Sequence, residues 1–212
     1  MTIDTDFRLV RHLADGTPVR FRLLVPEDRE ALRAGFERLS PESRYRRFFS
    51  PMPRLSEKFL DYLTRTDNEN HLAVVAERLD ENGNPCEGLG VARFVRSRDD
   101  PTVAEAAVAV VDEFQGRGVG TLLLWLLTCA ALERGITKFR GYVLADNEGT
   151  RAFLDALVEH PEIRFDGGTL LYEVALPASR APASPESGIR SLLRLAARGL
   201  ELSFREGRRS DR

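Results

Sequence analysis

The spacing of apolar residues along the chain predicts four helices and six strands. Helical spacing covers residues 27–39, 55–64, 120–134 and 149–158. Alternating patterns and short apolar runs between turn residues predict strands at 19–25, 71–79, 89–95, 104–111, 139–144 and 169–176. The strand at 104–111 reads as buried on both faces, or nearly so. The order β α α β β β α β α β predicts an α+β fold, with a mixed central sheet of about six to seven strands flanked by helices.

The pattern changes over residues 177–186, where three prolines stand among alanines and serines. This composition predicts an exposed linker between a compact domain over 1–176 and a tail over 187–212. In the tail, apolar residues and arginines follow helical spacing on separate faces, which predicts a C-terminal basic amphipathic helix. Such a helix could dock on its own domain, on a second subunit of a homodimer, on a protein partner or on an anionic membrane surface, and a disordered tail is the alternative.

Composition and charge narrow the class of protein. The 212 residues are 42% hydrophobic and 30% charged, which is typical of a globular protein and excludes a disordered chain. The net charge of −2 is the sum of an acidic body and a basic C-terminal part. From Pro177 onward there are eight arginines against four acids, a balance of +4, so the preceding body carries −6. The acidic body argues against a nucleic-acid partner.

Signals for membranes, export and metals are weak. The longest apolar run, 119–132, is shorter than the roughly 18–20 residues of a membrane span, and the N-terminus lacks the apolar core of a signal peptide. Cys86 and Cys129 are far apart and the three histidines are scattered, so neither a disulfide framework nor a metal site is expected. We therefore expect a reduced, cytoplasmic protein without stable membrane insertion.

Candidate chemistry is concentrated in residues 108–124, where a strand runs into a glycine-rich loop and the loop opens an apolar helix. Gly116, Gly118 and Gly120 let backbone amides approach a ligand closely. The helix N-terminus adds unpaired amides and the positive end of its dipole. These features predict a phosphate or pyrophosphate site, with Arg117 as a mobile cation beside it.

Two common phosphate loops do not match this segment. A Walker A loop ends in Gly-Lys-Ser/Thr, which is absent here. A Rossmann loop has the spacing G-x-G-x-x-G and follows the first strand of its domain. This loop reads G-x-G-x-G and follows several strands.

The segment Gln115-Gly-Arg-Gly-Val-Gly120 resembles the Q/R-x-x-G-x-G/A signature of the GCN5-related N-acetyltransferase (GNAT) superfamily, whose order of elements is similar over residues 20–176. The resemblance implies that acetyl-coenzyme A binds here. It implies that the strand before the loop diverges from its neighbour, and that its backbone polarises the thioester carbonyl. The implied cofactor-binding residues are Val110, Val111, Gln115, Gly116, Arg117, Gly118, Val119, Gly120, Thr121 and Asn147.

Residues 39–51 resemble the acetyltransferase domain of bacterial protein lysine acetyltransferases. In those domains the catalytic glutamate lies ten residues before the signature glutamine, which corresponds to Glu105. A carboxylate at this point would take the proton of the attacking ammonium group. Many family members carry a tyrosine as general acid seven residues after the asparagine, and this chain has Leu154 there.

The resemblance therefore implies an acetyl-CoA-dependent N-acetyltransferase that acts on a primary amine by direct attack in a ternary complex. The leading acceptor is a protein lysine. Two alternatives stay open: a small-molecule amine as acceptor, and a non-catalytic module that senses acyl-CoA. Tyr142 and Tyr172 are expected to pack in strands rather than to catalyse.

Overall fold

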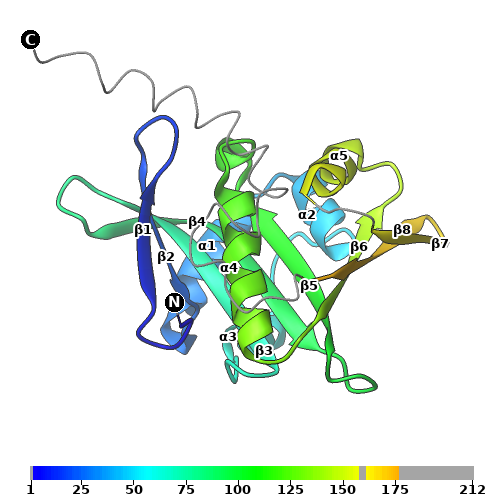
Figure 1. Cartoon of the computed structure of the whole chain (residues 1–212). Coiled ribbons are helices and arrows are strands. Elements are labelled where there is room, and N and C mark those ends of the chain that lie inside the picture. The colour runs from blue at the N-terminus through cyan, green and yellow to red at the C-terminus, as the bar shows by residue number, and fades with distance from the viewer. Residues whose placement is uncertain (1, 158–160, 177–212) are drawn as a thin grey trace, which may run out of the picture.

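A computed structural model describes residues 2–157 and 161–176 of the chain, and its strands form one eight-stranded sheet in the order β1-β2-β3-β4-β5-β6-β8-β7 (Figure 1). Neighbouring strands are antiparallel except β5 and β6, which are parallel. The strands are β1 (Arg8–His12), β2 (Pro18–Leu23), β3 (His71–Leu79), β4 (Pro85–Arg96), β5 (Val103–Val110), β6 (Lys138–Leu144), β7 (Glu162–Asp166) and β8 (Thr169–Ala175). The helices are α1 (Arg29–Glu37), α2 (Pro41–Phe48), α3 (Glu57–Thr64), α4 (Val119–Glu133) and α5 (Glu148–Leu157), with short 3-10 turns η1 (Pro26–Asp28) and η2 (Asp112–Phe114).

The helices cover both faces of the sheet. On one face α4 packs across β3, β4 and β5, and it buries Leu123, Leu126 and Leu127 completely. On the other face α1, α2 and α3 enclose a second, smaller apolar cluster around Phe36 and Leu60. Figure 1 shows α4 in front of the sheet and the other three helices behind it. Strand β5 therefore lies between two different environments.

Hydrogen bonds tie the start of α2 to the end of β5. The Ser40 hydroxyl caps α2 by accepting a hydrogen bond from the Ser43 amide at 3.1 Å. The Asp112 carboxylate, which follows β5, accepts from the Ser40 amide at 2.7 Å and from the Ser43 hydroxyl at 2.5 Å. The α2 helix is thus held against the strand that carries the candidate chemistry.

The structure confirms the α+β class and adds two strands to the six that the pattern predicts. The added strands, β1 and β7, lie at the two edges of the sheet. Both are mostly or entirely exposed, so they lack the apolar runs by which buried strands are found in a sequence. The linker 177–186 and the tail 187–212 lie outside the described residues.

The expected burial of β5 on both faces is wrong. Only Val103 and Ala104 of this strand are buried, Glu105 is exposed and the rest are half-buried. Within the described residues, no helix is long and apolar enough to cross a membrane.

Candidate active site

Strand β5 loses its neighbour on one side partway along its length. Residues 103–105 pair with residues 138–140 of β6, and no further pair joins these two strands in the described chain. On its other side β5 stays paired with β4 as far as Val110. The two parallel strands therefore diverge after Glu105, and we call the unpaired side of residues 107–110 the gap.

The backbone amide and carbonyl groups of every second residue of β5 face this gap. The Val111 amide donates to the Leu89 carbonyl at 2.9 Å, and the Val111 carbonyl accepts from the Phe114 amide at 2.9 Å. Both Val111 groups thus have partners within the protein, and a ligand contact by either group would be in addition to these bonds. Because backbone groups alternate in direction along an antiparallel pair, those of Val108 and Val110 point away from β4 and toward the gap.

The loop after β5 leaves a row of backbone amides unused. In the part of the chain that the structure describes, the amides of residues 116–121 donate no hydrogen bond. Gly116 and Gly118 have φ angles of 72° and 87°. A Cβ at either position would meet no atom within 4 Å, so the backbone conformation rather than lack of space favours glycine. Unpaired amides at a helix N-terminus form a cradle for an anion.

Packing sets the position of this cradle. Val119 is fully buried in the core, so only its backbone can face a ligand. A Cβ at Gly120 would lie 3.6 Å from the Val110 side chain, which shows how closely α4 approaches β5. Thr121 is half-buried in the first turn of α4. The Gln115 side-chain amide donates to the Val110 carbonyl at 3.1 Å and fastens the loop to the strand.

The remaining residues of the expected cofactor set already have partners within the protein. Arg117 forms an ion pair with Asp15 at 3.0 Å, and its guanidinium lies over the ring of Phe114. The Asn147 side-chain oxygen accepts from the Thr150 amide at 3.1 Å and so caps α5. A direct ligand contact by either side chain would be in addition to these structural roles.

Glu105 is exposed near the start of β5, opposite Val95 of β4 and Arg140 of β6. Its carboxylate forms neither a hydrogen bond nor an ion pair with any described residue. Arg140 is bound instead to Glu173, at 2.6 Å. A carboxylate that is free of such partners can accept a proton from a substrate.

Side chains from three other elements lie on the same side of the sheet as Glu105. Arg93 of β4 is 6% exposed, and its Nη1 donates to the Leu63 carbonyl at 3.2 Å and lies 3.1 Å from His71 Nε2. Because arginine only donates, Nε2 must be the acceptor and the imidazole is neutral. Burial, and then the charge of Arg93, lower the pKa of His71. Arg47 of α2 lies near Glu105: burial lowers the pKa of Arg47, and the negative charge of this carboxylate partly raises it again.

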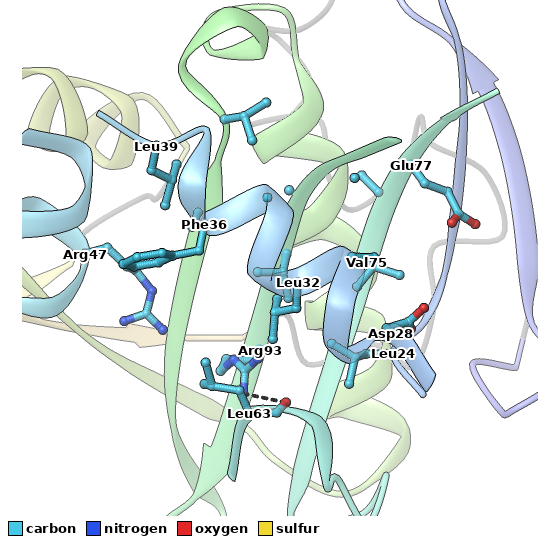
Figure 2. Close-up of a pocket in the computed structure, with 18 of the residues that line it drawn as sticks. Leu24, Asp28, Leu32, Phe36, Leu39, Arg47, Leu63, Val75, Glu77 and Arg93 are labelled. Atoms are coloured by element: carbon cyan, nitrogen blue, oxygen red, sulfur yellow. Dashed lines mark hydrogen bonds between the residues drawn. The ribbon is translucent and has the colours of Figure 1, made fainter. Parts of the chain in front are cut away.

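A cavity of about 110 Å³ lies between the sheet and the helices α1, α2 and α3, several times the roughly 10–15 Å³ that holds one water on this measure. Its walls are mainly apolar. Figure 2 shows Arg47 and Arg93 toward one end and Asp28 and Glu77 toward the other. Sequence patterns missed this cavity because its lining comes from segments far apart in the chain.

The two tyrosines differ in their surroundings. Tyr172 of β8 is 2% exposed, in agreement with packing. Tyr142 of β6 is 41% exposed, so the expectation of packing is wrong for this residue. Side chains alternate along a strand, which puts Tyr142 on the same face as Arg140, beyond the point where β5 and β6 diverge.

Comparison with known proteins identifies similar chains. Residues 29–157 match the model of the acetyltransferase (GNAT) family. Acetyltransferase Pat of Mycolicibacterium smegmatis is 34% identical over 78% of this chain. The matching region makes up only 48% of the length of that relative. Acetyltransferase PA5475 of Pseudomonas aeruginosa is 34% identical over 69% of this chain and 75% of its own. The crystal structure of the GNAT domain of S. lividans PAT, 32% identical, covers 80% of this chain and 97% of its own with a TM-score of 0.69.

Proposed function

The chain belongs to the acetyltransferase (GNAT) family, and on that premise we propose that it moves acetyl from acetyl-CoA to a primary amine by direct attack in a ternary complex. One observation carries this proposal. Strand β5 holds Glu105, whose carboxylate has no hydrogen-bond or ion-pair partner among the described residues, and the chain continues into backbone donors that start at Val108 and end at Thr121. The candidate base and the candidate anion site thus lie on one continuous stretch of chain, formed by β5, the loop after it and the start of α4.

The donor side of this arrangement fits acetyl-CoA, which supplies an acyl group activated as a thioester. The unpaired amides of residues 116–121 would hold the pyrophosphate. The amides of Val108 and Val110 would face the pantetheine arm and donate to the thioester carbonyl oxygen, where negative charge develops. At about 3.3 Å per residue, Val108 lies roughly 10 Å along the strand from Glu105.

Glu105 would act as the base. An ammonium group must lose a proton before its nitrogen can attack a carbonyl carbon. The Glu105 carboxylate has no competing partner among the described residues, so it can take that proton directly or through a water molecule. The freed amine then attacks, while the backbone amides stabilise the carbonyl oxygen.

A proton must also reach the departing thiolate. Leu154 has no proton to give. Tyr142 offers an exposed hydroxyl on the diverging strand β6, so we include it as the candidate general acid.

The leading acceptor in this proposal is a protein lysine. Support comes from residues 39–51, which resemble protein lysine acetyltransferases and form the α2 region beside Glu105. A small-molecule amine is the second candidate. Incubation of the protein with labelled acetyl-CoA and a bacterial lysate distinguishes them, because the label enters either protein or small amines.

The test of the function is Glu105→Gln. Acetyl transfer should fall by roughly 10²–10⁴-fold, while the affinity for coenzyme A stays unchanged. Glu113→Gln is the matched control, since Glu113 is exposed and forms an ion pair with Arg38. Undiminished transfer by Glu105→Gln would refute its role as base. No transfer by the wild-type protein to any amine would favour a module that only senses acyl-CoA.

A further inference from the structure

Arg47 and Arg93 line one end of the cavity without a carboxylate partner among the described residues. Arg47 donates no hydrogen bond to any of them. Arg93 engages only its Nη1 atom, with the Leu63 carbonyl and His71. Most of the N–H donors of two guanidinium groups are thus available to a ligand in the cavity.

A third arginine of the same cavity shows what ordinary pairing looks like here. Arg22 is bound to Asp28 at 2.6 Å and to Glu77 at 2.9 Å. Two carboxylates of the protein thus neutralise the Arg22 guanidinium. Arg47 and Arg93 have no such carboxylate partner among the described residues, and the Arg47 guanidinium lies over the ring of Phe48.

The electrostatics of the pair agree with this. Burial lowers the pKa of Arg47, an effect that nearby Glu105 partly offsets. Burial and then the charge of Arg47 lower the pKa of Arg93 to about 10, so the Arg93 guanidinium remains protonated at neutral pH. Arg93 is 6% exposed and Arg47 is half-buried, and the two like charges repel each other. An anion bound between them would relieve this repulsion and the desolvation of Arg93.

We propose that Arg47 and Arg93 bind a carboxylate carried by the amine acceptor. Glu105 lies near Arg47 on the same side of the sheet, and a negative group next to positive ones is complementary to an ammonium and a carboxylate on one molecule. The apolar walls of the cavity would receive the aliphatic part of that molecule. Two acceptors have this chemistry: a free amino acid with an apolar side chain, and a lysine beside an acidic residue in a peptide. This inference rests on the proposed transfer of acetyl to an amine.

The test compares acceptors that differ only in this charge. Initial rates with acetyl-CoA are measured for leucine against leucinamide, and for blocked Glu-Lys against blocked Gln-Lys peptides. The same ratios are then measured in Arg47→Gln and Arg93→Gln, so that differences in amine reactivity cancel. Arg46→Gln is the matched control, because Arg46 lies one residue along α2, is exposed and is bound to Glu42 at 2.5 Å.

We expect the wild-type protein to prefer the carboxylate member of at least one pair by about tenfold in kcat/KM, through KM, since hydrogen bonds between charged groups are the strong ones. Arg47→Gln should abolish that preference and leave the affinity for coenzyme A unchanged, whereas Arg46→Gln should keep it. The pair that shows the effect identifies the amino acid or the peptide as its source. Arg47→Gln gives this answer even if Arg93→Gln does not fold.

Three results would overturn the inference. The first is acetyl transfer with no preference in either pair, or with a preference that survives Arg47→Gln. The second is a preference for succinyl-CoA over butyryl-CoA that disappears in Arg47→Gln, which would put the carboxylate on the acyl donor. The third is absence of transfer to every acceptor, which would refute the proposed function itself and the inference with it.

Discussion

The two sides of strand β5 are built in different ways. On the loop side, the candidate anion cradle consists of backbone amides from one stretch, residues 116–121. On the helix side, the candidate acceptor site consists of side chains from α2, β3, β4 and β5, among them Arg47, His71 and Arg93. A backbone site is local and depends on conformation, whereas a side-chain site depends on how distant elements pack.

Gly118→Val should break the loop side most severely. The φ of 87° at this position is strained for a β-branched residue, by roughly 1–3 kcal/mol, and the loop would relax to another conformation. We expect the affinity for coenzyme A, measured by calorimetry, to fall at least about hundredfold. Gly83→Val is the control, because Gly83 has a similar φ of 80° in the turn between β3 and β4. Equal losses of affinity in both variants would mean that the loop is not the binding site.

Tyr142→Phe tests the strand that faces β5 across the gap. If the hydroxyl protonates the departing thiolate, kcat should fall about hundredfold with no change in the affinity for coenzyme A. Tyr45→Phe is a suitable control, since Tyr45 is equally exposed, at 44%, but lies on α2. A kcat within twofold of the wild-type value would exclude Tyr142 as the acid.

Asp112→Asn tests the hydrogen bonds that hold the start of α2 against the end of β5. Asp112 accepts hydrogen bonds from the Ser40 amide and the Ser43 hydroxyl, so its loss should destabilise the protein by about 1–3 kcal/mol. Urea unfolding measures this change in free energy. Asp99→Asn, in an exposed loop, should change it by less than about 0.5 kcal/mol. Equal stability of the two variants would show that these hydrogen bonds contribute nothing.

Acidification should lower the free energy of unfolding through His71, and this effect should be smaller than that of Asp112→Asn. The pKa of His71 is lowered in the folded protein, so the unfolded chain takes up this proton first as the pH falls below about 6.5. Stability should therefore decrease from that pH down to the lowered folded pKa. Urea midpoints at pH 7.5 and 5.5 should differ less in His71→Gln than in the wild-type protein. An identical pH dependence in both would contradict the neutral, accepting imidazole.

The same contrast explains what the sequence could predict. Gly116 and Gly118 are readable because a positive φ leaves a compositional signature within six residues. The direction of backbone groups at Val111 is not readable, because it depends on the register of β5 against β4. In the same way, Arg47 and Arg93 are 46 positions apart in the sequence, and only the packing of α2 over the sheet brings them to one cavity.

The edges of the sheet show a second limit of the sequence pattern. Buried strands such as β3 carry apolar runs that predict them well. Edge strand β7 is exposed along its whole length and forms because β8 offers it hydrogen-bonding partners. The local hydrophobic pattern therefore predicts the buried strands, whereas the edge strands depend on hydrogen bonding to a neighbouring strand.

The most direct test of the assignment of β5 is a titration of ¹⁵N-labelled protein with coenzyme A, followed through the backbone amide resonances. The amides of Gly116, Gly118 and Gly120 should shift strongly, together with those of Val108 and Val110. The amide of Val111 should stay nearly unchanged, because it is bound to the Leu89 carbonyl. Saturable binding that leaves the amides of residues 116–121 unshifted would contradict the assignment of the loop as the pyrophosphate site.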